Sequence, residues 1–253
     1  MRVDGRKFDE LRPIKVIRNF QKFAAGSVLI EFGETKVICS ATIEDKVPAF
    51  LKNSKSGWVT SEYSLLPGST SDRTARDSTQ GKISGRSQEI QRMIGRALRA
   101  VVDLKALGEK TIWLDCDVIQ ADGGTRTAAV TGAWLALFDA LLTLDRKNKK
   151  FPITDFLAAV SVGIVNEHVL LDLDYSEDSH ASVDLNLVLT GQARIVEIQG
   201  TAELEPFDFS ILQEILNMAQ KGIFQLVRIQ QDFAGEFFHN LLTVKGFNDS
   251  VPE

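Results

Sequence analysis

The sequence predicts an α+β protein. Segments typical of β-strands come in runs that precede helical segments, instead of alternating with them one by one, and this order occurs once in each half of the chain. The chain has 253 residues, of which 44% are hydrophobic and 25% are charged. Those proportions are typical of a globular protein and exclude collagen, coiled coil and disorder as the main architecture.

The first half contains the clearest strand signals. Residues 26–44 predict two strands joined at Gly33–Glu34, and a third strand is expected at 57–65. A polar stretch at 67–85 follows. It is too long to be a plain connector, and long loops in compact domains are often functional.

Two helices are predicted next, with a strand between them. The first runs from about 86 to 103, because Ile90, Ile94 and Leu98 recur at helical spacing. Residues 111–120 predict the strand. A turn at 122–126 then opens the second helix, which continues to about 144.

The second half repeats this plan. A hairpin is expected at 157–173 and another from 183–189 and 194–199, and helices are expected near 209–221 and within 222–243, with Asp208 or Ser210 as the N-cap of the first. The chain shows no repeat at the level of residues. A duplication is therefore indicated only by the order of the elements.

Several classes of protein are excluded by composition. The two cysteines, Cys39 and Cys116, form no CxxC motif, and the three histidines form no HExxH motif, so a disulfide framework and a cysteine or histidine metal site are not expected. No apolar run approaches the roughly 18 residues that span a bilayer. The charged N-terminus lacks an apolar signal core. We therefore expect a cytoplasmic protein with no membrane segment.

The charge is unevenly distributed along the chain. Residues 1–100 contain 18 basic and 11 acidic side chains, whereas residues 155–210 contain 11 acidic side chains and a single basic one, Arg194. The basic segment 1–100 could bind a polyanion, while the acidic segment 155–210 serves a different role. Taken alone, the asymmetry is better explained by an uneven solvated surface.

The turn Asp122-Gly123-Gly124-Thr125-Arg126 has the residue types of an anion site. Glycines allow close backbone approach, a helix start offers free N–H groups, and threonine and arginine add donors that suit phosphate. A tight turn with an exposed arginine is the alternative. A second basic helix start, Gly81-Lys82-Ile83-Ser84-Gly85-Arg86, could place Arg86 opposite Arg126, although a surface role explains Lys82 better.

Carboxylates between 172 and 184 form the candidate metal site. Asp184 lies in an apolar strand, where alternation places it on the same face as Asn186, and Asp178 lies in the loop before that strand. Two carboxylates together with substrate phosphates are a usual arrangement for Mg²⁺. For Asp172 and Asp174 we expect the solvated face of a strand.

The remaining basic residues allow two interpretations. Three of them follow one helix face and two lie in the polar stretch, and a solvated surface explains them adequately. A nucleic-acid track that grips the phosphate backbone would explain them together with two arginines near the N-terminus. The residues are Arg92, Arg96 and Arg99, then Arg73 and Arg76, then Arg2 and Arg6.

Many ordered stretches of the chain resemble the ribonuclease PH family. These stretches are Arg2–Arg6, Gly57–Pro67, Gly81–Arg86, Glu89–Asp103, Asp115–Thr127, Asp178–Asp184 and Val196–Glu203. The resemblance covers roughly residues 1–225. It implies a duplicated fold like the second domain of ribosomal protein S5, with mixed sheets packed with helices, as one domain over 1–253 with pseudo-duplicated halves of about 1–150 and 151–245.

The same resemblance implies a function. It implies a phosphate-dependent 3′–5′ exoribonuclease, also called tRNA nucleotidyltransferase, that trims tRNA precursors with inorganic phosphate and releases nucleoside diphosphates. It also implies a requirement for Mg²⁺, with rRNA as a further possible substrate. It implies a homo-hexamer built as a trimer of dimers. The alternative is a non-catalytic RNA-binding ring subunit of an exosome-like assembly, which typically lacks the full set of arginines and aspartates.

The resemblance also implies roles for individual residues. Arg86, Gly124, Thr125 and Arg126 match phosphate-binding positions, and Asp178 and Asp184 match catalytic positions that act through the metal. Arg73 and Arg76 match arginines that grip tRNA or support assembly, and Arg92 joins them as an expected RNA contact. The chain departs from the family pattern at Gly68, where many members have arginine, and at Ala193, where many have glycine.

Overall fold

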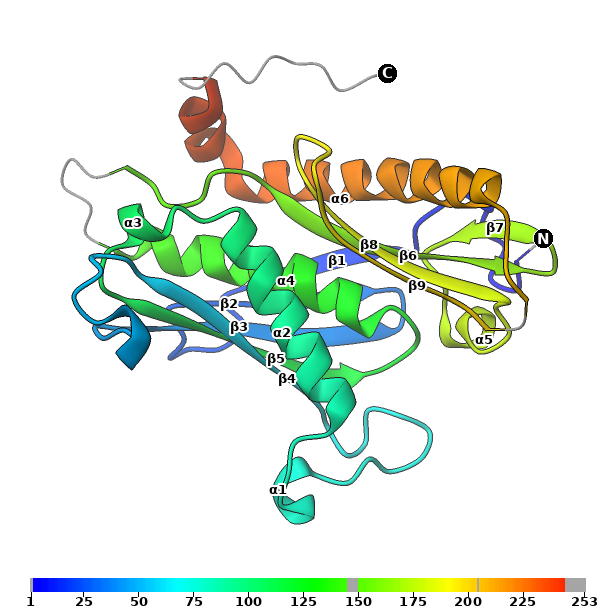
Figure 1. Cartoon of the computed structure of the whole chain (residues 1–253), viewed down its shortest axis with the longest axis horizontal. Coiled ribbons are helices and arrows are strands. Elements are labelled where there is room, and N and C mark those ends of the chain that lie inside the picture. The colour runs from blue at the N-terminus through cyan, green and yellow to red at the C-terminus, as the bar shows by residue number, and fades with distance from the viewer. Residues whose placement is uncertain (1, 145–149, 204, 244–253) are drawn as a thin grey trace.

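The computed structural model describes residues 2–144, 150–203 and 205–243, and it contains two β-sheets (Figure 1). The first sheet has the strand order β1-β2-β3-β5-β4, in which β4 is parallel to β5 and the other pairs are antiparallel. Its strands are β1 (Ile14–Arg18), β2 (Gly26–Phe32), β3 (Thr35–Glu44), β4 (Trp58–Leu65) and β5 (Thr111–Gln120). The strands predicted at 26–44, 57–65 and 111–120 are confirmed.

The second sheet is antiparallel, with the order β7-β6-β8-β9. Its strands are β6 (Leu157–Val165), β7 (His168–Leu171), β8 (Val183–Thr190) and β9 (Ile195–Ala202). Both predicted hairpins are confirmed. With one mixed and one antiparallel sheet, each followed by helices, the predicted α+β class is confirmed as well.

Helices fill the space between the sheets and cover the outside of the second one. The α-helices are α1 (Asp77–Gln80), α2 (Gly85–Ala100), α3 (Leu104–Leu107), α4 (Thr125–Leu142), α5 (Tyr175–Asp178) and α6 (Phe209–Thr243), and a 3-10 turn spans Ala49–Leu51. Helices α2 and α4 lie between the sheets, and α6 packs on the far face of β6, β7 and β8 (Figure 1). The layers are therefore sheet, helices, sheet, helix.

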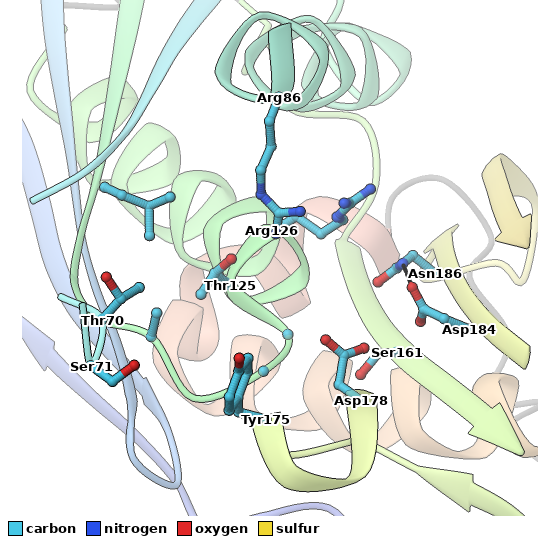
Figure 2. Close-up of a pocket in the computed structure, with 14 residues that line it drawn as sticks. Thr70, Ser71, Arg86, Thr125, Arg126, Ser161, Tyr175, Asp178, Asp184 and Asn186 are labelled. Atoms are coloured by element: carbon cyan, nitrogen blue, oxygen red, sulfur yellow. Dashed lines mark hydrogen bonds between the residues drawn. The ribbon is translucent and has the colours of Figure 1, made fainter. Parts of the chain in front are cut away.

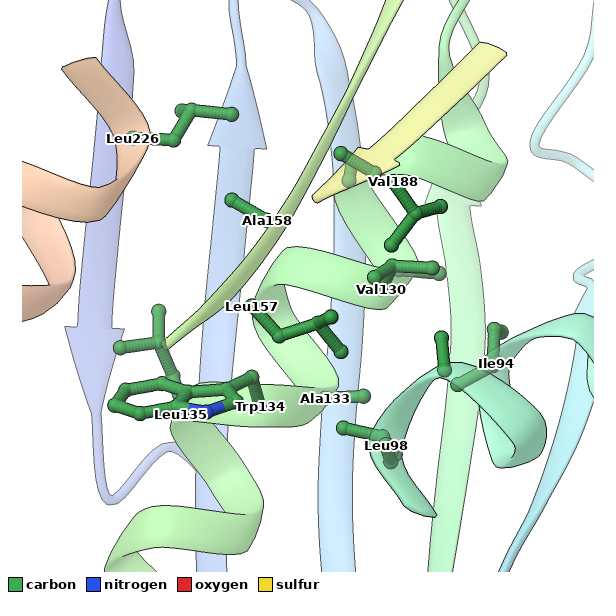
Figure 3. Packing of buried hydrophobic residues seen from close by; sticks show 14 of the residues in the cluster. Ile94, Leu98, Val130, Ala133, Trp134, Leu135, Leu157, Ala158, Val188 and Leu226 are labelled. Atoms are coloured by element: carbon green, nitrogen blue, oxygen red, sulfur yellow. The ribbon is translucent and has the colours of Figure 1, made fainter. Parts of the chain in front are cut away.

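Helix α4 is the centre of the core. Both sheets contact it, and for this reason it is apolar on all sides, in contrast to the amphipathic α2. Its Val130 and Trp134 belong to the same buried hydrophobic cluster as Leu98 of α2 and Leu157 of β6 (Figure 3). A Cβ at Gly132 would lie 2.7 Å from Ile30, so glycine lets the helix approach β2. This packing fixes where the N-terminus of α4 points.

The C-terminal helices differ from the prediction. A break was expected near residue 222, but α6 continues through Gly222 and its helical geometry is interrupted at Gly235, where φ is +60°. Gly222 is needed for packing, because a Cβ there would lie 2.7 Å from Leu171. Asp208 precedes α6, and its carbonyl accepts from the amides of Ile211 and Leu212. Within the described residues, no helix is both long and apolar enough for a membrane span.

Candidate active site

The turn between β5 and α4 has the geometry of an anion-binding loop. Gly123 and Gly124 adopt φ values of +73° and +62°, in the left-handed region that favours glycine. A Cβ at Gly123 would lie 2.5 Å from the carbonyl oxygen of Leu173, so a larger residue does not fit. Gly124 precedes the first turn of α4, which no described side chain caps. The amide N–H groups of this first turn are therefore available to an oxyanion.

This turn forms one wall of a cavity of about 450 Å³ (Figure 2). The residues that line it are Leu65, Thr70, Ser71, Arg86, Ala121, Gly123, Gly124, Thr125, Arg126, Ser161, Tyr175, Asp178, Asp184 and Asn186. They come from both halves of the chain. The structure thus brings together the six residues expected to bind phosphate or metal, although they are distant in sequence.

Two guanidinium groups point into the cavity from different helices (Figure 2). Arg86 lies in the first turn of α2 and is exposed, and no described residue forms a hydrogen bond or an ion pair with its side chain. Arg126, in the first turn of α4, donates to the amide oxygen of Gln199 on β9 and lies 3.7 Å from the carboxylate of Glu89. Arg126 is therefore held in place, whereas Arg86 is free to meet an anion.

The hydroxyl of Thr125 is partly used inside the protein. It lies 2.8 Å from the hydroxyl of Tyr63 in a buried hydrogen bond. Burial raises the pKa of Tyr63, so its phenol stays neutral and can act as the donor. Thr125 then keeps its own proton to donate to a ligand in the cavity.

Asp178 and Asp184 lie across the cavity from the arginines (Figure 2). Asp178 ends the short helix α5, where a loop was expected, and Asp184 lies on β8 as predicted. Burial, together with the charge of Asp178, raises the pKa of Asp184 to about 6. Burial also raises the pKa of Asp178, while Arg86 and Arg126 oppose that shift. The two carboxylates are thus poised to share a cation or a proton.

The geometry of these carboxylates fits a hard divalent cation. The Oδ1 atom of Asp184 is buried and has no hydrogen-bond partner among the described residues, while its Oδ2 accepts from Asn186 over 3.4 Å. Nowhere in the described part of the chain do three or more His, Cys, Asp or Glu side chains form a metal cluster. Two carboxylates suit Mg²⁺, which keeps several waters and completes its shell with substrate phosphates.

The expected RNA-contacting residues lie outside the cavity lining. Arg73 and Arg76, between β4 and α2, and Arg92, on α2, are all exposed. Arg96 instead forms an ion pair of 2.7 Å with Glu197, and Arg99 lies over the Trp58 ring.

The nucleic-acid track proposed for the N-terminal arginines is wrong. Arg2 and Arg6 are only 6% and 8% exposed, because both are paired with acidic groups of the second half. The solvated strand face expected for Asp172 and Asp174 is also wrong. Asp172 is fully buried and paired with Arg12, and Asp174 forms a capping box with Glu177 at the start of α5.

Sequence reasoning missed two residues of the site, Gln199, which holds Arg126, and Tyr175. Gln199 bonds to both Arg126 and Glu89, and these three residues come from β9, α4 and α2. No spacing in the sequence links them. Tyr175, which is 62% exposed and lines the cavity, was also missed, although an aromatic residue three positions before Asp178 was a usable signal.

Comparisons with known proteins agree with this architecture. Residues 10–143 match the model of the 3′ exoribonuclease family, domain 1, and residues 155–222 match that of domain 2. The chain is 56% identical over 238 residues to Ribonuclease PH of Moorella thermoacetica, covering 93% of this chain and 95% of that protein. It is also 56% identical over 245 residues to Ribonuclease PH of Bacillus cereus, covering 95% of this chain and all of that protein.

Solved structures show the same fold at low sequence identity. An Archaeoglobus fulgidus exosome with RNA bound to the active site matches with a TM-score of 0.77 at 22% identity, covering 91% of this chain and 92% of that one. Rice (Oryza sativa) Rrp46 matches with a TM-score of 0.76 at 16% identity, covering 92% of this chain and all of that one. From the two family models and the close relatives together, we conclude that this chain belongs to the 3′ exoribonuclease family.

Proposed function

We propose that this protein is a phosphorolytic 3′–5′ exoribonuclease, a nucleotidyltransferase that trims the 3′ ends of tRNA precursors. One observation carries the proposal: Arg86, Arg126, Asp178 and Asp184 converge on one cavity beside the N-terminus of α4. The high identity to proteins named Ribonuclease PH supports the same activity.

Inorganic phosphate binds between Arg86, Arg126 and the turn 124–126. One of its oxygens attacks the phosphorus of the last phosphodiester, and the bond from that phosphorus to the 3′ oxygen of the preceding nucleotide breaks. The products are a nucleoside 5′-diphosphate and an RNA shorter by one nucleotide, whose new 3′ hydroxyl takes the proton of the incoming hydrogen phosphate. Since the nucleophile is already anionic, the protein mainly positions the reactants and stabilises charge.

Asp178 and Asp184 are the residues that would hold Mg²⁺. A bound Mg²⁺ supplies positive charge to the phosphoryl oxygens. The raised pKa of Asp184 and the unpartnered Oδ1 atom support this assignment, because burial and the charge of Asp178 outweigh the effect of Arg126 and leave a carboxylate oxygen that a cation could bind.

The site favours an enzyme over a non-catalytic ring subunit, since it contains both arginines and both carboxylates. Arg73, Arg76 and Arg92 are proposed to grip the RNA backbone outside the cavity, on the basis of their exposure and charge. We also propose a hexameric ring, supported by the likeness to exosome structures. A cytoplasmic location is supported by the two free, buried cysteines.

The first test is the phosphate dependence of the reaction. The purified protein is incubated with a tRNA that carries extra 3′ nucleotides, with and without phosphate, and the released nucleotides are identified. We expect nucleoside diphosphates, and only when phosphate is present. Release of monophosphates without phosphate would show a hydrolase that uses water instead.

Arg86→Ala and Arg126→Ala test the phosphate site. Each is expected to reduce phosphorolysis by about 10³-fold, because an arginine that stabilises such a transition state is worth at least that much. Arg228→Ala, an exposed arginine on α6, is the matched control and is expected to keep full activity. Full activity of both site variants at saturating phosphate would overturn the assignment.

A further inference from the structure

Three arginines from the first twelve residues lie buried against the second half of the chain. Arg2, Arg6 and Arg12 are 6%, 8% and 4% exposed. Their acidic partners Asp172 and Glu177 are 0% and 7% exposed. Burying this many charges is costly unless they are paired and hydrogen-bonded, and this network meets that condition almost completely. Neither carboxylate lines the cavity, so the proposed chemistry does not use the network directly.

Arg12 lies between Asp172 and the glycine turn. Its Nη2 and Nε atoms donate to the two carboxylate oxygens of Asp172, over 2.7 Å and 3.1 Å, and its backbone amide donates to the same carboxylate over 2.8 Å. On its other side the guanidinium donates to the carbonyl oxygens of Asp122 and Gly123. A Cβ at Gly124 would lie 3.0 Å from Nη2, so the turn fits closely around this side chain.

Arg2 holds the other side of the cavity. It donates to Glu177 over 2.7 Å and to the carbonyl oxygens of Leu171 and Asp172 over 2.7 Å and 2.9 Å. Glu177 directly precedes Asp178 in α5, a helix of only four residues. A helix this short is not stable alone, so these contacts set its position.

Asp172 and its neighbours therefore join the two sides of the cavity. Asp172 has φ of +55°, and its side chain meets Arg12 while its carbonyl oxygen meets Arg2. A direct bond completes the connection, because the amide of Tyr175 donates to the carboxylate of Asp122 over 3.3 Å. The turn that receives phosphate and the helix that carries Asp178 are thus fixed to one buried network.

We propose that Arg12 is a positioning residue that, through Asp172, sets the phosphate-binding turn relative to Asp178. The proposal rests on the phosphate site proposed above. Displacements of about 1 Å at such a site cost about 10²-fold in rate. Loss of the Arg12 contacts lets the turn move, so it weakens phosphate binding while the RNA-gripping surface outside the cavity is unchanged.

The test compares Arg12→Lys with the double variant Arg12→Met/Asp172→Asn. The double variant removes both charges, so no unpaired buried carboxylate remains and the protein is expected to fold. Both variants should raise the KM for phosphate by about 10- to 100-fold, with RNA affinity in the absence of phosphate unchanged. Arg18→Met is the matched control, since Arg18 pairs with the buried Asp139 of α4 without touching the cavity.

The outcomes separate the alternatives. If the network only stabilises the fold, the double variant will have the melting temperature and the phosphate KM of the unmodified protein. That result would overturn the proposal. If Arg126→Ala raises the phosphate KM but the Arg12 variants do not, the positioning role fails and the phosphate site stands. If Arg126→Ala also leaves that KM unchanged, the phosphate site itself is wrong.

Discussion

At the scale of single residues, Asp184 lies in surroundings that oppose its charge. Burial and Asp178 raise its pKa to about 6, whereas an aspartate in an unfolded chain has a pKa of about 3.9. Below about pH 4 both states are protonated and the residue costs nothing. Between about pH 4 and pH 6 the unfolded chain loses this proton before the folded protein does, so the free energy of unfolding falls over this range and stays lowered above pH 6. The protein therefore retains a carboxylate that weakens its fold, as expected for a group kept for binding or catalysis.

Asp184→Asn is expected to stabilise the fold and to abolish activity. The melting temperature at neutral pH without divalent metal should rise by about 2–4 °C for each kcal/mol gained, and the gain should vanish near pH 4. Phosphorolysis should fall by at least about 10²-fold, the usual effect of removing one electrostatic contact at a reacting phosphoryl group. Thermal unfolding at several pH values and nucleotide release measure the two effects. Asp232→Asn, an exposed site on α6, is the control, and an active Asp184→Asn enzyme would contradict the metal role.

At the scale of elements, the hairpin between β8 and β9 contains a strained residue. Ala193 adopts φ of +57°, where a Cβ crowds the backbone. The resemblance to the ribonuclease PH family leads us to expect glycine at this position. The strain is confined to the turn. The strands on both sides of it remain paired antiparallel, with a register shift between Val188 and Leu189.

Ala193→Gly is expected to stabilise the protein by about 1 kcal/mol, because glycine adopts this conformation without a steric cost. The melting temperature should then rise by about 2–4 °C. The turn does not line the cavity, so the phosphate KM should stay the same. A lower melting temperature would show that the flexibility glycine adds to the unfolded chain exceeds the strain it relieves.

Elements with a strong local pattern were predictable from the sequence, and those set by distant contacts were not. Alternation and turn residues located the strands of 26–44 and both later hairpins. Helix α5 was missed, because it is held by Arg2 and Glu177, which are 175 positions apart. Two helices were expected on either side of residue 222, but α6 continues through Gly222, which allows close packing on Leu171. The residues at 86, 124–126, 178 and 184, which line the cavity, could be selected from the sequence by their residue types. Gln199, Arg12 and Asp172 could not be selected, because their roles depend on tertiary contacts.

At the scale of the whole molecule, part of the charge asymmetry is neutralised internally. Arg2, Arg6 and Arg12 of the basic segment 1–100 pair with the acidic second half, and Arg96 pairs with Glu197. The charge available for RNA therefore comes from fewer side chains than the sequence alone indicated. Gly68, in the loop after β4, is exposed, and a Cβ there would meet no atom within 4 Å. A longer side chain can be added at this position without strain.

Gly68→Arg is expected to tighten RNA binding or ring assembly, because it adds a guanidinium near Arg73 and Arg76. One new phosphate contact should increase the slope of log affinity against log salt by about 0.7–0.9. Titration with tRNA at several salt concentrations and light scattering measure the two effects. Gly68→Gln adds similar bulk without charge and serves as the control. Unchanged affinity and unchanged particle mass would show that this position serves neither role.

The contact between Arg2 and Glu177 has a consequence for synthesis. A chain emerging from the ribosome exposes its first residues long before position 177 is synthesised. The first sheet can therefore form early, while the N-terminal arginines are still unpaired. The carboxylate at 184 is translated later still. A nascent chain therefore has no complete cavity beside the ribosome's own RNA, and nuclease competence arises only after most of the polypeptide has been made.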